Sequence, residues 1–166
     1  MIRLARPDDL PAVRRVETSA ATIFAGTHMD FAANDAPNDP ADLLAAIAAG
    51  LMWVACADDV VVGFVFAEPC ATGLYVRELS VAAQQQQRGH GNALMAACMA
   101  AARWRGDGEM VLTTDRTLAW NAPFYQRLGF MIVEGEAIPA DAQRRLTAQY
   151  AAGFDPRHRC AMVLPL

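Results

Sequence analysis

The segment Gln84–Asn92 has the residue types and spacing most clearly suited to chemistry. It follows a short apolar run, Leu79–Val81, and precedes an alanine- and leucine-rich stretch of helical character. A loop in this position directs several backbone N–H groups to one point, where the helix N-terminus adds a partial positive charge. Gly89 and Gly91 let the backbone approach a ligand closely and take unusual φ angles. The segment therefore predicts a site for a phosphate-bearing ligand that needs no lysine.

Two better-known phosphate loops do not fit these residues. A Walker-type loop ends in Gly-Lys-Ser/Thr, whereas this segment ends in His90-Gly91-Asn92. A dinucleotide-binding fingerprint needs a third small residue where this chain has Leu94.

Hydrophobic spacing predicts a mixed α/β fold around this loop. The expected helices are 10–21, 39–50, 92–105, 121–128 and 138–152, and the expected strands are 2–6, 51–57, 60–67, 73–81, 110–113, 130–134 and 159–164. A hairpin followed by alternating strands and helices indicates a mixed sheet with helices on both faces. Residues 23–40 read as irregular.

Composition limits the class of protein. A chain of 166 residues that is 54% hydrophobic and 19% charged predicts one globular domain, 1–166. The net charge of −4 argues against a nucleic-acid partner. The longest apolar run, 43–57, is shorter than the about 20 residues that span a bilayer, so we expect no membrane segment. The four cysteines form no Cys-x-x-Cys pair, which argues against zinc and favours a reducing, cytoplasmic compartment.

Two patches resemble the GNAT superfamily of acyl-CoA-dependent N-acetyltransferases. Residues 86–91, Gln-Gln-Arg-Gly-His-Gly, fit the Gln/Arg-x-x-Gly-x-Gly/Ala signature of that family. Residues 121–130 resemble its Asn…Phe-Tyr-x-x-x-Gly-Phe segment. Two departures are Gln87, where the family often has glycine, and Ala83, where it often has proline; both affect loop stiffness more than chemistry. The resemblance implies a mixed, mostly antiparallel sheet of about seven strands, splayed at the cofactor site.

The resemblance also implies which residues hold the cofactor, acetyl-CoA. Loop N–H groups would bind its pyrophosphate, and the backbone of 79–81 would pair with the pantetheine arm and polarise the thioester carbonyl. The implied cofactor-binding residues are Leu79, Ser80, Val81, Gln86, Gln87, Arg88, Gly89, His90, Gly91, Asn92, Asn121 and Tyr125. For Asn121, capping the following helix is an equal alternative. No metal is expected.

Catalytic roles follow for Tyr125 and Glu78. Tyr125 matches the family tyrosine that donates a proton to the departing thiolate; the alternative is a core tyrosine. Glu78, on the preceding strand, is the expected base for the ammonium acceptor; the alternative is a surface glutamate paired with Arg77 or another arginine. His28, beside Asp30 in the irregular segment, is a second candidate base.

The acceptor site is the least defined. Phe24, His28 and Tyr75, together with Phe31 and Trp120, are candidates to line it, although core packing explains most of them equally well. We expect direct transfer of acetyl to a small-molecule amine in a ternary complex. The alternatives are a non-catalytic acyl-CoA-binding module and a protein or peptide N-acetyltransferase. The long 137–156 segment would shape the substrate site or form a homodimer contact.

Overall fold

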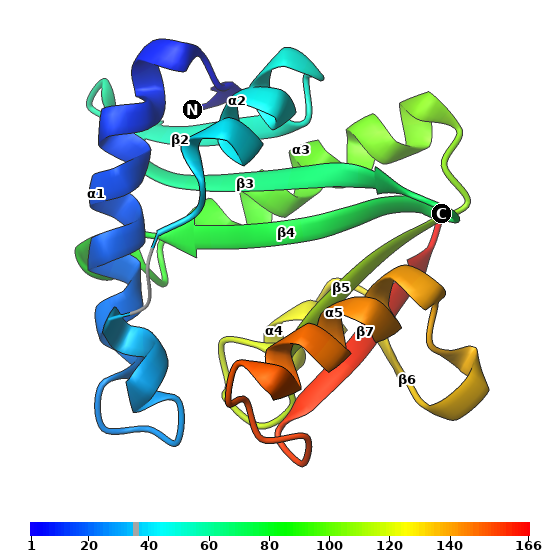
Figure 1. Ribbon diagram of the computed structural model, residues 1–166. Coiled ribbons are helices and arrows are strands. Elements are labelled where there is room, and N and C mark those ends of the chain that lie inside the picture. The colour runs from blue at the N-terminus through cyan, green and yellow to red at the C-terminus, as the bar shows by residue number, and fades with distance from the viewer. Residues whose placement is uncertain (35–36) are drawn as a thin grey trace. The chain divides into compact units, whose positions relative to one another are not determined.

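The protein is described by a computed structural model covering residues 1–34 and 37–166 (Figure 1). Its helices are α1 Leu10–Ala21, α2 Pro40–Ala48, α3 His90–Arg105, α4 Ala122–Arg127 and α5 Ala140–Ala151. Its strands are β1 Ile2–Leu4, β2 Met52–Ala57, β3 Val60–Cys70, β4 Gly73–Val81, β5 Glu109–Asp115, β6 Met131–Val133 and β7 Arg159–Pro165. No helix within these described ranges is long and apolar enough to cross a membrane.

These elements match the expected order, and the differences are confined to their ends. Helix α3 begins at His90, two residues earlier than its apolar pattern suggests, because a helix N-terminus tolerates polar residues. Strand β3 continues to Cys70. The irregular segment 23–40 contains the short 3₁₀ turns Thr22–Phe24 and Asp30–Asn34, while residues 35–36 lie outside the described part of the chain.

The strands form a seven-stranded sheet in the order β1-β2-β3-β4-β5-β7-β6. The β1–β2, β2–β3, β5–β7 and β6–β7 pairs are antiparallel, whereas β4 and β5 are parallel through Gly73–Tyr75 and Glu109–Val111. A parallel pair needs a long connection, which α3 supplies. Gly73 starts this ladder with φ +156°, and a Cβ there would lie 2.0 Å from the Glu109 carbonyl oxygen. The expectation of a mixed, mostly antiparallel sheet is confirmed.

Contacts divide the chain into two compact units, 1–67 with 77–101 and 68–76 with 102–166. In the first unit, α1 and α2 bury Val13, Val16 and Leu43 against Met52, Val54, Phe64 and Phe66 of β2 and β3. Helix α3 covers the opposite face, where a Cβ at Gly63 would lie 3.3 Å from Leu94. The first unit therefore has helices on both faces of its strands.

The second unit has its own core. Ala142 and Leu146 of α5 pack against Tyr75, Val111, Ala161 and Val163. The α4 helix ends before Gly129, whose φ of +98° is that of a left-handed glycine cap. A Cβ at Gly129 would lie 3.3 Å from Leu164, so this turn approaches β7 closely.

Candidate cofactor and catalytic site

The predicted phosphate loop connects β4 to α3 within the first unit. After Val81 the chain is held by two backbone donors: Ala82 N donates to Val62 O at 2.9 Å, and Ala83 N donates to Ser19 Oγ at 3.0 Å. Gln86 Nε2 then donates to Val81 O at 3.1 Å, which closes the loop on itself. These bonds fix the start of the loop to α1 and β3.

The rest of the loop is open. Gln87, Arg88 and Gly89 are exposed, and Gln87 and Gly89 have φ angles of +60° and +85°. No atom lies within 4 Å of a Cβ built on Gly89, so the backbone conformation, not crowding, favours glycine there. Gly91 was also expected to need an unusual φ, and this is wrong: it lies in the first turn of α3, where helical φ suits any residue.

The first turn of α3 supplies the donors of this loop. Ala93 N is bonded within the turn, to Gly89 O at 3.0 Å. The N–H groups of His90, Gly91 and Asn92 precede it, and such first-turn donors have no acceptor within their own helix. Together with the helix dipole they form an arrangement that suits a phosphate group.

Glu78 lies three residues before the end of β4, and its carboxylate is bonded at both oxygens. Ser80 Oγ donates to Oε1 at 2.6 Å, and Asn38 Nδ2 donates to Oε2. The contact with Ser80 places both side chains on one face of β4, as the two-residue period of a strand requires. Glu78 is only half-exposed, so these two donors hold its carboxylate in one orientation.

A second carboxylate lies beside this one. Glu17, a buried residue of α1, accepts from Asn38 N at 3.0 Å and from Asn38 Nδ2 at 2.6 Å through Oε1. Its Oε2 accepts from Arg14 Nη1 at 3.0 Å. Burial raises the pKa of Glu78, the charge of Glu17 raises it further, and the bonds from Ser80 and Asn38 oppose the shift. A raised carboxyl pKa brings a base closer to neutral pH.

The surroundings of Glu78 differ from the surface ion pair that was its alternative interpretation. Arg77 turns to Asp42, with Nη2 to Oδ2 at 3.1 Å, and its guanidinium lies 5.5 Å from the centre of the Phe66 ring. Sequence reasoning missed both Glu17 and Asn38. A signal existed for Glu17, because it is a charged residue on the apolar face of α1. Nothing in the sequence distinguished Asn38 from other loop asparagines.

Tyr125 belongs to the second unit. It is 9% exposed on α4, and its ring meets Phe124 and Phe130 edge-on at centroid distances of 5.1 and 5.7 Å. Asn121 stands at the N-cap position, but its side chain makes no capping hydrogen bond, so that interpretation is wrong. Its backbone carbonyl instead accepts from Phe124 N and Tyr125 N, at 2.9 and 3.1 Å.

The candidate acceptor residues divide between the two units. Phe24 is half-buried, and His28 and Phe31 are exposed, all in the first unit. Tyr75 is 3% exposed in the second unit, with its hydroxyl 2.6 Å from Thr113 Oγ1, and Trp120 is 39% exposed before α4. The core-packing alternative is therefore confirmed for Tyr75, whose hydroxyl also has a polar partner.

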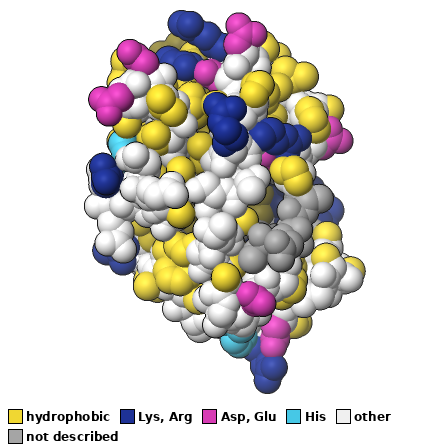
Figure 2. Space-filling model, turned by 90° about the vertical axis from the view of Figure 1, so that its left-hand side faces the viewer, with side chains coloured by type: hydrophobic (Ala, Val, Ile, Leu, Met, Phe, Trp, Pro, Cys, Tyr) yellow, Lys and Arg dark blue, Asp and Glu magenta, His cyan; other side chains and the backbone are white. Residues whose placement is uncertain are grey.

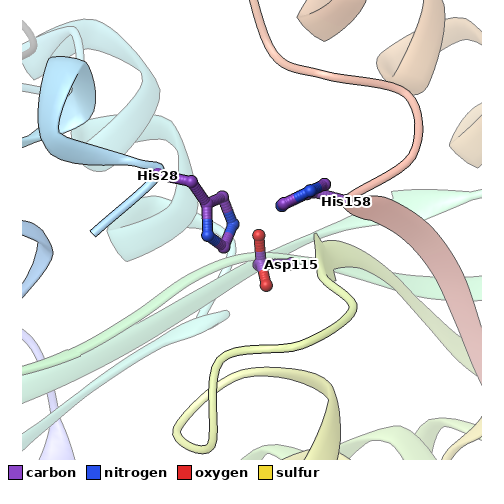
Figure 3. A group of neighbouring side chains, drawn as sticks. All are labelled: His28, Asp115 and His158. Atoms are coloured by element: carbon purple, nitrogen blue, oxygen red, sulfur yellow. The ribbon is translucent and has the colours of Figure 1, made fainter.

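Figure 3 shows two polar residues of the second unit, Asp115 at the end of β5 and His158 just before β7. A carboxylate oxygen of Asp115 and a ring nitrogen of His158 lie within 4.8 Å of each other. Asp115 is buried, and its Oδ1 accepts from Thr117 N, Thr117 Oγ1 and Leu118 N. Asp115 thereby closes the turn that leaves β5.

The side of the molecule in Figure 2 carries basic and acidic side chains interspersed with hydrophobic ones. On α1, Arg14, Arg15 and Thr18 line a shallow, open pocket. The sequence contains no lysine, so all 14 residues of the lysine-plus-arginine total are arginines.

Comparison with known proteins gives the family. The model of the family described as "Acetyltransferase (GNAT) domain" matches residues 48–132, just over half of the 166 residues. The chain therefore belongs to the GNAT acetyltransferases. The matched range contains β4, the phosphate loop and α4, the elements that carried the resemblance.

Solved structures show the same fold along the whole chain. A Mycobacterium tuberculosis protein in complex with CoA has a TM-score of 0.68 at 20% identity, covering 100% of this chain and 99% of its own. The PaiA N-acetyltransferase of Thermoplasma acidophilum, in complex with coenzyme A, has a TM-score of 0.72 at 16% identity and coverages of 100% and 98%. A ribosomal-protein-alanine N-acetyltransferase from Brucella melitensis has 0.72 at 20% identity and coverages of 100% and 99%.

Proposed function

We propose that this GNAT acetyltransferase transfers an acetyl group from acetyl-CoA to the primary amine of a small molecule, by direct attack in a ternary complex. The observation that carries the proposal is the position of Glu78. A half-buried carboxylate, held by Asn38 and Ser80, stands on the strand that leads directly into the phosphate loop. Two structural relatives are described in complex with coenzyme A, which supports the choice of donor.

The donor half of the site is formed by the loop and the strand before it. Loop and first-turn N–H groups of α3 bind the pyrophosphate, and Arg88 adds a charge-assisted contact. The backbone of Leu79–Val81 pairs with the pantetheine arm and polarises the thioester carbonyl. Gln86 acts on the loop itself, because its side chain is bonded to Val81 O.

The reaction needs two proton transfers. An ammonium acceptor gives a proton to the Glu78 carboxylate, directly or through water, and its nitrogen lone pair then attacks the thioester carbon. The tetrahedral intermediate collapses when the C–S bond breaks, and coenzyme A leaves as a thiolate. Tyr125 gives its phenolic proton to that sulfur. The products are the N-acetylated amine and coenzyme A, and both side chains recover their original protonation by exchange with solvent.

The three buried cysteines, unlike the partly exposed Cys70, are poor candidates for the nucleophile of a covalent acetyl-enzyme. Cys56 and Cys160 are buried, and burial raises the pKa of the Cys160 thiol to about 11. A thiol with that pKa is almost entirely protonated at neutral pH and is a poor nucleophile.

A peptide acceptor is the second candidate function. It is favoured by the likeness to the Brucella melitensis ribosomal-protein-alanine N-acetyltransferase, which covers this whole chain. An acyl-CoA-binding module without transfer is the third, and a homodimer is compatible with each of them.

A thiol-release assay with acetyl-CoA distinguishes these functions. The acceptor panel contains amino acids, polyamines, aminoglycosides and short peptides, each with wild type and Glu78→Gln. The chain has no lysine, so no side-chain amine of the protein itself competes with the added acceptor. We expect release with one class of small amine. Release with peptides alone would favour the second function, and acetyl-CoA binding without release from any acceptor would refute transfer.

A further inference from the structure

Ser80 contributes a side-chain hydroxyl to which the proposed reaction gives no role. Its Oγ donates to Glu78 Oε1 at 2.6 Å, a length typical of a hydroxyl bonded to an ionised carboxylate. The two residues are separated by Leu79 on β4, and both belong to the first unit. The proposed base therefore has a hydroxyl bonded directly to one of its oxygens.

Ser80 stands in the part of β4 that leaves the core. Residues 73–76 of the strand are buried, whereas residues 77–81 are half-buried and lead into the phosphate loop. Ser80 thus keeps part of its surface in contact with solvent, as a residue must if it is to receive a proton from a bound molecule.

The two partners of the Glu78 carboxylate differ in what they can do with a proton. At Oε2 the donor is the Asn38 amide, which is also bonded to Glu17 Oε1 and has N–H groups that only donate. A hydroxyl has one donor and two acceptor lone pairs. Within residues 1–34 and 37–166, the bond to Glu78 is the one hydrogen bond of Ser80 Oγ, and it uses the donor. Ser80 can therefore accept from a second molecule while it donates to Glu78.

We propose that Ser80 relays the proton of the ammonium acceptor to Glu78. One N–H bond of the ammonium breaks as a new O–H bond forms on Ser80, and the original hydroxyl proton moves to Glu78 Oε1. Ser80 remains a neutral hydroxyl, Glu78 becomes the neutral acid, and the amine keeps the lone pair that attacks the thioester. Both protons move in one step, because a serine hydroxyl is a very weak acid and a very weak base. This inference rests on the proposed transfer reaction and holds for small-molecule and peptide amines alike.

A matched pair of variants tests the relay. Ser80→Thr keeps the hydroxyl, whereas Ser80→Val has the same branched shape with a methyl group in its place, and both residues suit a strand. Acetyl transfer is followed in single turnovers with acetyl-CoA and the amine that wild type uses. We expect Ser80→Thr to stay within about three-fold of wild type and Ser80→Val to be slower by about 100-fold, the scale of a lost proton-transfer group. Thr147→Val is the control, since Thr147 is exposed and its hydroxyl is bonded within α5.

The rates are compared on the plateau of the pH profile. Burial raises the pKa of Glu78 and the bond from Ser80 lowers it, so Ser80→Val should also move the acid limb to higher pH. The other charges around Glu78 are the same in both variants: Glu17 and its partner Arg14 on α1, Arg77 on β4, and its partner Asp42 on α2. A serine that only orients the carboxylate would move this limb and leave the plateau rate unchanged.

A solvent isotope experiment counts the protons that move. Single-turnover rates in mixtures of ordinary and heavy water fall along a bowed curve when two protons move in one step, and along a straight line when one moves. We expect a bowed curve for wild type and Ser80→Thr, and a curve closer to a straight line for Ser80→Val. The proton transfer from Tyr125 is common to all three proteins, so the difference belongs to Ser80.

Two measurements establish that the variants are comparable. The Tm and the Kd for acetyl-CoA should be close to those of wild type in Ser80→Thr and Ser80→Val. If the Tm of Ser80→Val is much lower, Ser80→Ala replaces it. Its rate should then be about ten-fold below that of Ser80→Thr, because a water molecule fills the space of the hydroxyl and replaces it only in part.

Three results would overturn the relay. The first is an equal plateau rate in the variants with and without the hydroxyl, and the second is an equally bowed isotope curve in Ser80→Val. The third is an acetyl group on Ser80, found by peptide mass spectrometry after wild type is incubated with acetyl-CoA alone. That product would make Ser80 the nucleophile of a covalent intermediate, with Glu78 as its base.

The failure of transfer is distinguishable from the failure of the relay. Absence of thiol release from wild type with every acceptor would overturn the transfer reaction and the relay together. Release by wild type that is lost in Glu78→Gln and kept in Ser80→Val would retain Glu78 as the base and overturn only the relay.

Discussion

Glu17 and Glu78 accept hydrogen bonds from the same atom, Nδ2 of Asn38. One carboxylate belongs to α1 and the other to β4, and the asparagine comes from the loop before α2. The negative charge of Glu17 opposes the ionisation of Glu78, and the shared donor Asn38 favours it. The protonation of Glu78 therefore depends on residues that need not contact the substrate.

Replacing Glu78, the proposed base, should remove the acid limb from the pH profile of kcat/KM. In wild type, kcat/KM should fall on the acid side as Glu78 becomes protonated, at a pH above that of an ordinary glutamate. Glu78→Gln should lower kcat by about 100-fold or more and abolish that limb. Steady-state kinetics across pH checks both effects, with Glu136→Gln, an exposed glutamate, as control. An unchanged limb in Glu78→Gln would assign the base elsewhere.

The same variant should stabilise the protein at neutral pH. The pKa of Glu78 is higher in the folded protein than its usual 4.5, so the folded state binds the proton more tightly. The benefit of that tighter binding is complete below the unfolded pKa and is lost as the pH rises through the folded pKa. At neutral pH the ionised, half-buried carboxylate is a net cost that Gln avoids. Thermal unfolding should show a higher Tm for Glu78→Gln at pH 7 and a smaller difference near pH 4, in line with the trade-off between stability and activity.

The two neighbours of Glu78 should shift its titration in opposite directions. Asn38→Ala removes a donor that favours the carboxylate, so the acid limb of kcat/KM should move to higher pH. Glu17→Gln removes a negative charge while keeping an acceptor for Asn38, so the limb should move to lower pH. Profiles of the two variants and of the double variant provide the measurement. If the acid limb moved in the same direction in both variants, Asn38 and Glu17 would act on folding and not on the titration of Glu78.

Tyr125→Phe should separate turnover from binding. The ring contacts with Phe124 and Phe130 do not involve the hydroxyl, so the variant should keep its fold and its Kd for acetyl-CoA. Loss of the proton donor should lower kcat by about 100-fold. Calorimetric binding and single-turnover kinetics test the two halves. Unchanged turnover would remove Tyr125 from the mechanism.

Gln87→Gly should relieve strain in the phosphate loop. Gln87 has a φ of +60°, which costs a residue with a side chain about 1 kcal/mol relative to glycine. We expect a small rise in Tm with no loss of acetyl-CoA binding. Gln84→Gly is the control, because Gln84 is an exposed residue of the short 3₁₀ turn before the loop, without a positive φ. There the added chain entropy should lower the Tm. A lower Tm for Gln87→Gly would indicate that its side chain stabilises the loop.

Local structure was predictable because its causes are local. The left-handed Gly89 and Gly129, the helix that follows the loop and the β2–β3 hairpin all follow from neighbouring residue types. Errors occurred where two local explanations compete, as at Asn121, which occupies the N-cap position without its side chain acting there. Gly91 was misjudged because a glycine pattern does not show where a helix begins.

The sequence by itself determined the family, the order of the elements and the loop that suits a phosphate, since each depends on residues close together in the chain. Only the tertiary structure brought Asn38 to Glu78, across 40 residues, and placed Arg159 in the interior beside Gln149. Hydrogen bonds between distant segments depend on how helices pack on the sheet, and that packing has no signature in the spacing of polar residues. The loop and the helix after it were therefore predictable from sequence, whereas the hydrogen-bond partners of Glu78 became visible only in the fold.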